Sequence, residues 1–220
     1  MKKMRATILA FVVGVGLLIS SNVATAAPST PAPPESDANI SGLADGTVVF
    51  EAEGEVGEYW VPPSAESETA DQEDGRITTQ SLILRDGVLV LYCGDPLQMH
   101  HVLEKFKSKY DKTIRLECGT NNGFGFNHIN KSHPKSQWVK QMGGKGSWTE
   151  YQQYLIRVAV TKPSKVKSQP GNKRCYQAPV KVYKMSNGKP KYWKTIEPSV
   201  IVSKNNKRVV TAMPTTKGYC

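Results

Sequence analysis

The chain has 220 residues and a mass of 24.2 kDa, and its 29 Lys and Arg against 19 Asp and Glu give a formal net charge of +10. Only one apolar run approaches the length of a membrane span, which excludes a membrane protein with several spans. Aromatic and β-branched residues persist to the C-terminal end, which excludes a wholly disordered chain.

Charge divides the chain into three parts. Residues 1–27 carry +3, and residues 28–84 carry twelve acids and one base, hence −11. Residues 85–220 carry 25 bases and seven acids, hence +18, and the three sums return +10. The length and this division predict one basic domain behind an acidic leader.

Residues 1–26 have the pattern of a secretory signal peptide. Three basic residues precede an apolar stretch from Ile8 to Ile19, and Ala24-Thr25-Ala26 supplies a small-x-small cleavage site. An uncleaved anchor helix is the alternative, but twelve apolar residues are short for a span of about 20. We therefore expect a secreted protein with no stable membrane association after cleavage.

Residues 27–80 are rich in Pro, Ser, Ala and acidic residues, which predicts a largely flexible leader. Its charge is opposite to that of the basic domain that follows. The leader could therefore mask that domain or serve only as a solubilising spacer, and the sequence leaves both roles open. We place the start of the folded domain at residue 81 and its end at residue 220.

The first part of that domain is expected to be a hairpin, a helix and a strand. Residues 81–92 predict two short strands around the turn pair Asp86-Gly87. A helix is expected from Pro96, because apolar residues after it recur near one face. Thr113–Cys118 has the pattern of a strand.

The second part predicts a helix followed by strands. A glycine-rich loop from Gly119 to Phe126 leads into His128, and Ser147 is a suitable N-cap for a helix over Trp148–Val160. The closing strands and their turns are Tyr176–Met185, Asn187-Gly188, Tyr192–Val202, Asn205-Asn206 and Arg208–Met213. The predicted fold class is α+β, with N-terminal helices packed on a small antiparallel sheet.

All four cysteines lie in the basic domain, and export would place them in an oxidising compartment. Three pairings are open. We favour Cys93–Cys118, which flanks one helix–strand unit, and Cys175–Cys220, which would fix the last strand. A zinc site is the alternative, but the sequence has no CxxC spacing.

The four histidines fall within 34 residues, at His100, His101, His128 and His133. The segment 123–133 is the richest in chemistry, because it combines glycines, two imidazoles and Lys131 directly after a predicted strand. An imidazole can both accept and donate a proton near neutral pH. We therefore predict that His128 and His133 share proton transfer.

Histidines without carboxylate partners on a domain of charge +18 suit the cleavage of RNA without a metal. A base deprotonates the 2′-hydroxyl, an acid protonates the leaving 5′-oxygen, and a cation or hydroxyl stabilises the phosphate. The basic surface would attract the RNA backbone. Exposed aromatic residues such as Tyr183, Tyr192 and Trp193, interleaved with lysines, would stack bases.

The segment GFGFNHINKSHP, the helix WTEYQQYLIRVAV and the strand Arg208–Pro214 resemble the C-terminal domains of bacterial polymorphic toxins. These are the metal-independent ribonuclease toxins of the barnase–EndoU–colicin–RelE group, and the similarity covers residues 95–215. The resemblance implies that His128 is a general base or acid and that Thr211 contacts the scissile phosphate. His133 and Lys131 match the same segment. Met213 departs from the pattern, since an aromatic residue is common there.

The expected substrate is therefore RNA, bound by Arg157, Tyr183 and Arg208, with no cofactor and no metal. A cognate inhibitor protein is the other expected partner, and the toxin is expected to be a monomer acting on competitor cells. One alternative is a metal-dependent HNH-like nuclease built from His100, His101, His133 and Asn122 or Asn127. Another is a non-enzymatic basic module that binds anionic polymers at the cell envelope.

Overall fold

The computed structural model describes residues 40–54, 57–62, 86–144 and 146–220, all within one compact unit. The helices of these residues are α1 (Asp86–Gly94), η1 (Pro96–Gln98, a 3₁₀ turn), α2 (Gly125–Ser132), α3 (Lys135–Gln141) and α4 (Trp148–Thr161). The strands are β1 (Val48–Ala52), β2 (Tyr59–Trp60), β3 (Val102–Ser108), β4 (Lys112–Glu117), β5 (Lys165–Gln169), β6 (Lys173–Gln177), β7 (Val180–Ser186), β8 (Lys189–Ile196), β9 (Ser199–Ser203) and β10 (Val209–Met213). The expected signal peptide lies outside the described residues.

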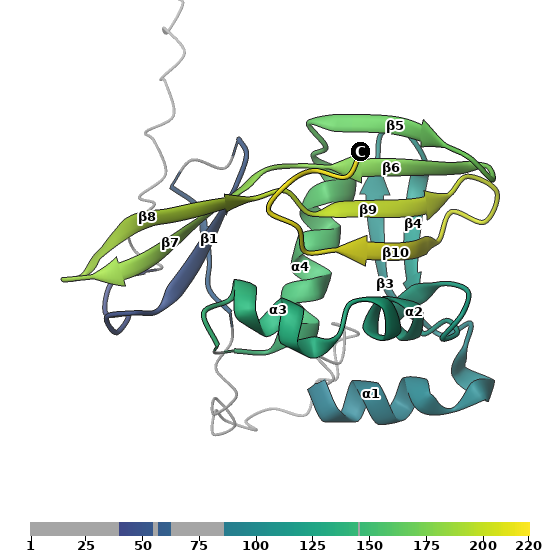
Figure 1. Cartoon of the computed structure of the whole chain (residues 1–220), viewed down its shortest axis with the longest axis horizontal. Helices are drawn as coiled ribbons and strands as arrows, with labels where there is room; N and C mark the ends of the chain where they lie inside the picture. Colours follow the sequence, from purple (N-terminus) through teal and green to yellow (C-terminus); the bar gives the residue numbers. More distant parts are fainter. Residues whose placement is uncertain (1–39, 55–56, 63–85, 145) are drawn as a thin grey trace, which may run out of the picture. The chain divides into compact units, whose positions relative to one another are not determined.

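The strands form three antiparallel sheets (Figure 1). Their orders are β2-β1-β7-β8, β10-β9-β6-β5 and the hairpin β3-β4. A single parallel bridge between Arg115 and Arg208 joins β4 to β10. The structure confirms the α+β class with small antiparallel sheets, and the more specific barnase-like fold remains a prediction.

Helix α4 is the centre of the core. It packs against β3, β6 and β9, and the ring of Tyr151 lies 4.9 Å from that of Phe50 on β1. The predicted N-cap is confirmed, because Ser147 Oγ accepts the backbone N–H of Glu150 at 3.3 Å. The carboxylate of Asp86 accepts the N–H groups of the next two residues of this helix start, Trp148 and Thr149. A negative charge at a helix N-terminus also stabilises the helix dipole.

Two prolines divide strands that were predicted to be continuous. Pro179 separates β6 from β7, and Pro198 separates β8 from β9, because proline cannot donate a hydrogen bond to a sheet ladder. The chain therefore leaves one sheet at Pro179, forms the β7–β8 hairpin, and returns at Pro198. The predicted turn Asn187-Gly188 closes this hairpin, with φ of +52° and +69°.

Part of the predicted leader belongs to the folded unit. The five residues of β1 are all buried, and their register pairs Phe50 with Val182 of β7. Hydrophobic burial of these residues outweighs the acidic composition around them. The boundary at residue 81 is therefore too late, while residues 27–39 and 63–80 lie outside the described residues.

The secondary structure expected for residues 81–108 is wrong in two places. Asp86–Gly94 is helix α1 rather than a hairpin, because the Asp86 carboxylate caps α4 and the buried Leu89 and Cys93 lie one turn apart. The helix expected from Pro96 ends after one 3₁₀ turn. From Val102 the chain pairs with β4 instead, so the ladder overrides the helical spacing. Helix α3 and strand β5 were not predicted.

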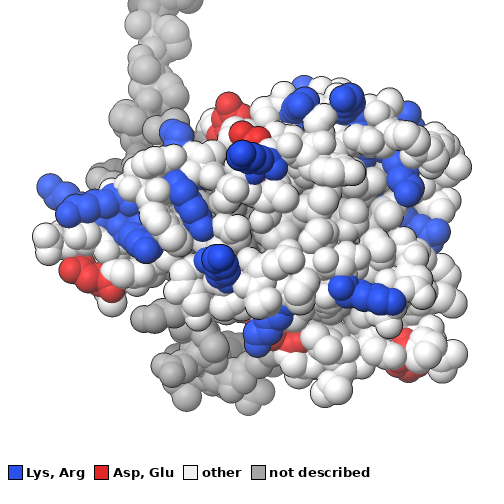
Figure 2. Space-filling model, in the orientation of Figure 1, with Lys and Arg blue, Asp and Glu red and all other residues white. Residues whose placement is uncertain are grey.

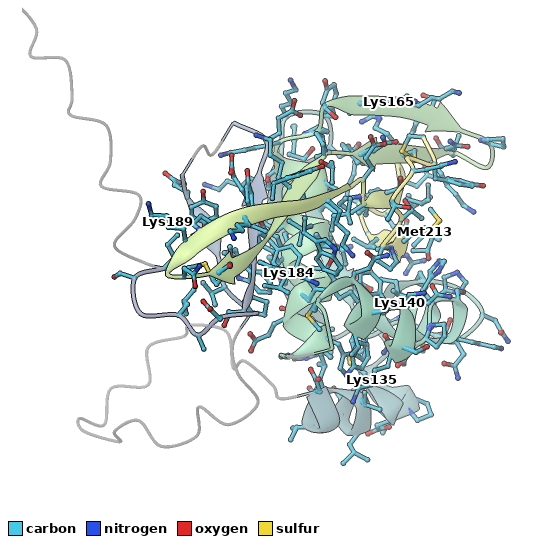
Figure 3. The ribbon with its side chains drawn as sticks, turned by 60° about the vertical axis from the view of Figure 1, so that its left-hand side comes forward. Lys135, Lys140, Lys165, Lys184, Lys189 and Met213 are labelled. Atoms are coloured by element: carbon cyan, nitrogen blue, oxygen red, sulfur yellow. A yellow bond between two sulfur atoms is a disulfide. The ribbon has the colours of Figure 1, made fainter. Side chains whose placement is uncertain are left out.

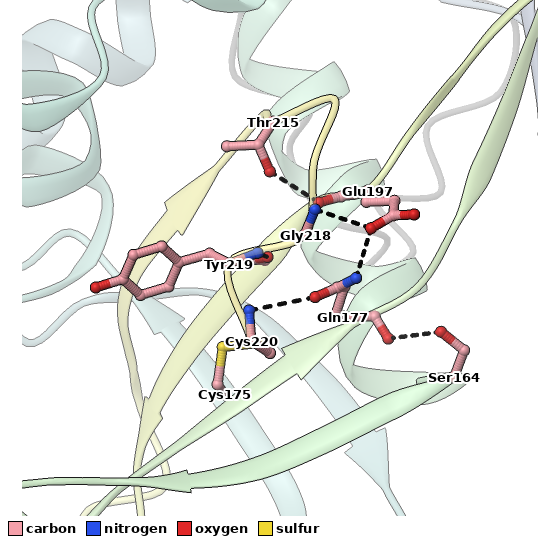
Figure 4. The surroundings of a disulfide bond; sticks show 9 residues. Ser164, Cys175, Gln177, Glu197, Thr215, Gly218, Tyr219 and Cys220 are labelled. Atoms are coloured by element: carbon pink, nitrogen blue, oxygen red, sulfur yellow. Dashed lines mark hydrogen bonds between the residues drawn. A yellow bond between two sulfur atoms is a disulfide. The ribbon is translucent and has the colours of Figure 1, made fainter.

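Both favoured disulfides are confirmed. Cys93 pairs with Cys118 and Cys175 with Cys220, at Cα separations of 5.0 and 5.7 Å. Around the second disulfide, Glu197 accepts the backbone N–H of Gly218 at 2.8 Å (Figure 4). These contacts fasten the C-terminal segment to the sheet of β6 and β9.

Candidate active site

The segment that joins β4 to helix α2 forms a tight loop, and the backbone at its two ends lies close together. Gly119 has φ +71°, and a Cβ placed on it would lie 1.7 Å from the backbone oxygen of Phe124. Gly125 has φ +78°, and its Cβ would lie 2.4 Å from the oxygen of Glu117. Only glycine fits either position. The predicted glycine-rich loop is therefore confined to the residues before Gly125, where helix α2 begins. His128 lies on this helix.

Asn127 and a disulfide hold the start of α2. The Asn127 side chain donates to the backbone oxygens of Cys93 at 2.6 Å and of Gly119 at 3.2 Å. Its backbone N–H donates to the oxygen of Cys118 at 2.9 Å. Because Cys93 and Cys118 are bonded to each other, α2 starts from a cross-linked base. The helix then packs along β10.

His128 is held through one of its two ring nitrogens. Its Nδ1 lies 3.1 Å from the backbone oxygen of Asn121. A carbonyl oxygen only accepts, so Nδ1 carries the hydrogen and Nε2 is left for another partner. Lys131, one turn further along α2, donates from Nζ to the Asn122 side-chain oxygen at 2.6 Å. Both side chains therefore fold back over the loop.

His133 follows at the C-terminal end of α2. Its Nδ1 lies 3.3 Å from Oε1 of Gln137, and its backbone oxygen accepts the indole N–H of Trp138 at 2.9 Å. Burial lowers the pKa of His133, the hydrogen bond that its ring donates to Gln137 raises it, and a positive charge on His128 lowers it. Burial therefore favours the neutral form of His133.

Thr211 lies on β10, the strand against which α2 packs. The register moves from Val209 opposite Val202 to Thr211 opposite Ile201, so Val210 is the extra residue of a β-bulge. Thr211 Oγ1 is buried and has no hydrogen-bond partner among the described residues. Buried hydroxyls are nearly always paired, so an unpaired one beside α2 needs an explanation.

A second group of side chains surrounds Glu117, which is 5% exposed at its side chain. Its carboxylate lies 3.1 Å from Arg115 Nε, 3.4 Å from His100 Nδ1 and 4.0 Å from Arg208 Nη1. We call these four residues the Glu117 cluster. Since cationic groups surround both oxygens, Glu117 is better suited to positioning the arginines than to accepting a proton.

Phe124 links the Glu117 cluster to α2. The guanidinium of Arg208 lies 3.6 Å from the centre of the Phe124 ring, and the His100 ring stacks on the same ring at 5.9 Å. Phe124 is the N-cap of α2, four residues before His128. The predicted residue Arg208 therefore lies at the start of the helix that carries the histidines.

The other two residues predicted to bind substrate are engaged elsewhere. Arg157 on α4 donates from Nε to Glu104 of β3 at 2.9 Å. Tyr183 on β7 donates to Glu51 of β1 at 2.7 Å, and burial, followed by this carboxylate, raises its pKa. The structure thus places His128 and Lys131 on α2, His133 at its C-terminal end, Thr211 on the strand packed against it and Arg208 beside its N-cap residue, whereas Arg157 and Tyr183 lie on other elements.

Sequence reasoning did not identify the Glu117 cluster. Arg115 and Glu117 are two apart on one strand and so share a face, which is a signal that the sequence contains. Arg208, by contrast, comes from 91 residues further along the chain. Only the bridge between β4 and β10 brings it to this face.

Comparisons with known proteins give no match: no family model, no curated protein and no solved structure matches the chain. In the described ranges, no three His, Cys, Asp or Glu side chains are grouped so that they could hold one metal ion. No helix in the same ranges is long and apolar enough to cross a membrane.

Proposed function

We propose that the protein is a secreted ribonuclease toxin that cleaves RNA without a metal ion, with His128 and His133 as its proton-transfer groups. The observation that carries the proposal is the state of these two imidazoles. Each has Nδ1 directed at an oxygen acceptor, and burial and its neighbour's charge favour neutral His133. Acid–base cleavage of RNA requires one group that accepts a proton and another that donates one, and a neutral His133 can accept one.

His133 acts as the base and His128 as the acid. Nε2 of His133 accepts the proton of the 2′-hydroxyl, whose oxygen forms a bond to phosphorus. The bond from phosphorus to the 5′-oxygen breaks, and that oxygen takes a proton from Nε2 of His128. The products are a 2′,3′-cyclic phosphate and a free 5′-hydroxyl, and the two histidines have exchanged protonation states, which solvent restores.

Cations and a hydroxyl beside these histidines would stabilise the pentavalent phosphate. Lys131 and Arg208 supply positive charge, and the unpaired hydroxyl of Thr211 donates one hydrogen bond. Glu117 would act as a positioning residue, since it holds Arg208 and Arg115 from a buried site. The two disulfides support the export of the protein to an oxidising compartment.

The test is cleavage of a long RNA in excess EDTA by the chain from residue 27 onward, because β1 belongs to the folded unit. We expect the parent to cleave and the variants His128→Ala and His133→Ala each to lose at least 100-fold in rate. His101→Ala is the matched control, because the His101 ring contacts Tyr92 of α1 and is not part of the proposed site. No cleavage by folded parent protein at low salt, or equal loss in the control, would overturn the proposal.

A further inference from the structure

The β7–β8 hairpin is a basic surface distinct from the histidines. Between Val180 and Ile196 the sequence has five lysines and no acidic residue. β8 is the outer strand of its sheet, and all of its residues except Ile196 are exposed or half-buried. Lys and Arg side chains gather over the hairpin, on the left of Figure 2. Such a local excess of positive charge attracts an anionic polymer.

Trp193 lies among these lysines on a β-bulge. Val182 pairs with Lys194 and Tyr183 with Tyr192, so Trp193 is the extra residue of β8. Bulges redirect side chains and are frequent beside functional sites. The indole is 38% exposed, and the ammonium groups of Lys184 and Lys194 lie 3.8 and 4.0 Å from its ring centre. An exposed indole and two ammonium groups therefore share one small area.

Lys181 of the hairpin pairs with Glu51 of β1 at 3.6 Å, but the lysines around Trp193 have no such partner among the described residues. No ion pair joins Lys184, Lys194 or Lys140 to a carboxylate within the described part of the chain, and Lys194 donates instead to the neutral Gln141 side chain at 2.7 Å. Burial lowers the pKa of Lys194, and the charges of Lys184 and Lys140 lower it further. Three like charges held near one another gain free energy when an anion binds between them.

Helix α3 connects this surface to the histidines. At its start Gln137 contacts His133, and at its end Gln141 contacts Lys194 and also donates to the oxygen of Pro214 after β10. Gln137 and Gln141 are one turn apart on α3, which is about 6 Å at 1.5 Å per helical residue. Figure 3 labels Lys135 at the start of α3, Lys140 in its last turn and Lys184 on the hairpin. A strand of a few nucleotides would reach from one site to the other.

We propose that Trp193, Lys184, Lys194 and Lys140 bind single-stranded RNA at a site separate from the histidines. The ammonium groups contact phosphates and the indole stacks on a base, which is the combination that proteins use for single strands. This inference rests on the proposed function, and it adds that the enzyme selects polymeric RNA. An anionic glycan would satisfy the ammonium groups but would make no use of base stacking.

The experiment measures binding of a labelled oligouridine by fluorescence anisotropy, using the inactive His128→Ala chain from residue 27 onward. We expect K184Q/K194Q to weaken binding at least tenfold and to reduce the slope of log K against log salt by about 1.4. The matched control is K165Q/K167Q on β5, which removes the same charge from exposed lysines of another sheet and should weaken binding less than threefold. Circular dichroism checks that each variant is folded.

Trp193→Ala separates RNA from other anions. We expect it to weaken oligouridine binding about tenfold and to leave binding of inorganic polyphosphate unchanged, because only the stacking contact is lost. Equal loss for both ligands, equal loss in K165Q/K167Q, or binding of heparin without binding of oligouridine would overturn the proposal. Trp193-dependent RNA binding by a parent that does not cleave RNA would instead overturn the proposed function and leave this site standing.

Discussion

The two disulfides close chain segments of 25 and 45 residues, and one of them lies beside the helix that carries His128. Cys93–Cys118 adjoins Gly119, and the Cys93 oxygen accepts the side chain of Asn127 at the start of α2. Cys175–Cys220 fastens the C-terminal segment to β6 instead. Removal of either disulfide should therefore lower stability alike, and removal of the first alone should loosen the candidate active site.

The expected losses follow from the sequence separations of 25 and 45 residues. The chain-entropy relation gives about 3.5 kcal/mol for C93S/C118S and about 4 kcal/mol for C175S/C220S at 25 °C. The two variants are thus matched in stability to within about 0.5 kcal/mol. Urea denaturation followed by circular dichroism measures both values.

The distinguishing assay is amide hydrogen exchange at a temperature where both variants remain folded. We expect the Asn127 amide, which donates to the Cys118 oxygen, to exchange at least tenfold faster in C93S/C118S than in C175S/C220S. RNA cleavage should fall in the same order. Equal exchange in residues 119–133 of the two variants would refute the claim that the first disulfide holds the site.

Three further predictions concern single residues. Gly119→Ala should destabilise the protein by more than about 3 kcal/mol because its Cβ would meet a backbone oxygen, whereas Gly188→Ala, with open space and φ +69°, should cost about 1 kcal/mol in the same urea assay. By NMR titration His133 should have a pKa below the ordinary value near 6.5, and His128→Gln should raise it by removing a neighbouring positive charge. Because the folded state then binds this proton less readily than the unfolded state, the contribution of His133 to stability should be lost as the pH falls below about 6.5; a pKa of His133 above that value would contradict the site geometry. Asp86→Ala should lower the free energy of unfolding by about 2 kcal/mol, since it removes hydrogen bonds to the first residues of α4, and a loss below about 0.5 kcal/mol would show that Ser147 alone is a sufficient cap.

The elements that sequence reasoning predicted correctly are those fixed by local chemistry. Ser147 caps α4, and Asn187-Gly188 closes the β7–β8 turn, because each depends on residues within a few positions. The cysteine pairs were favoured for the elements that they flank, and those elements do lie together.

The errors arise where distant partners decide. The residues of β3 have helical spacing, but they pair with β4, and β1 is a strand because β7 lies beside it. The candidate site shows the same division. His128, Lys131 and His133 could be identified from one segment, whereas the Glu117 cluster needs Arg208 from a strand near the other end of the chain.

The β7–β8 hairpin is inserted between two neighbouring strands, β6 and β9, of the sheet β10-β9-β6-β5. Gln177 of β6 and Ser199 of β9 are paired in the register, so the residues between them begin and end at neighbouring positions of the sheet. Changes in the length of the intervening residues would not shift the register of β6, β9 or β10, and Thr211 would keep its place beside α2. The pairing of β7 with β1 and the hydrogen bond from Lys194 to Gln141 of α3 restrain such changes. The part of the molecule that we propose selects the polymer can therefore diverge in evolution, or be exchanged in the laboratory, while the part that we propose cuts it remains as it is.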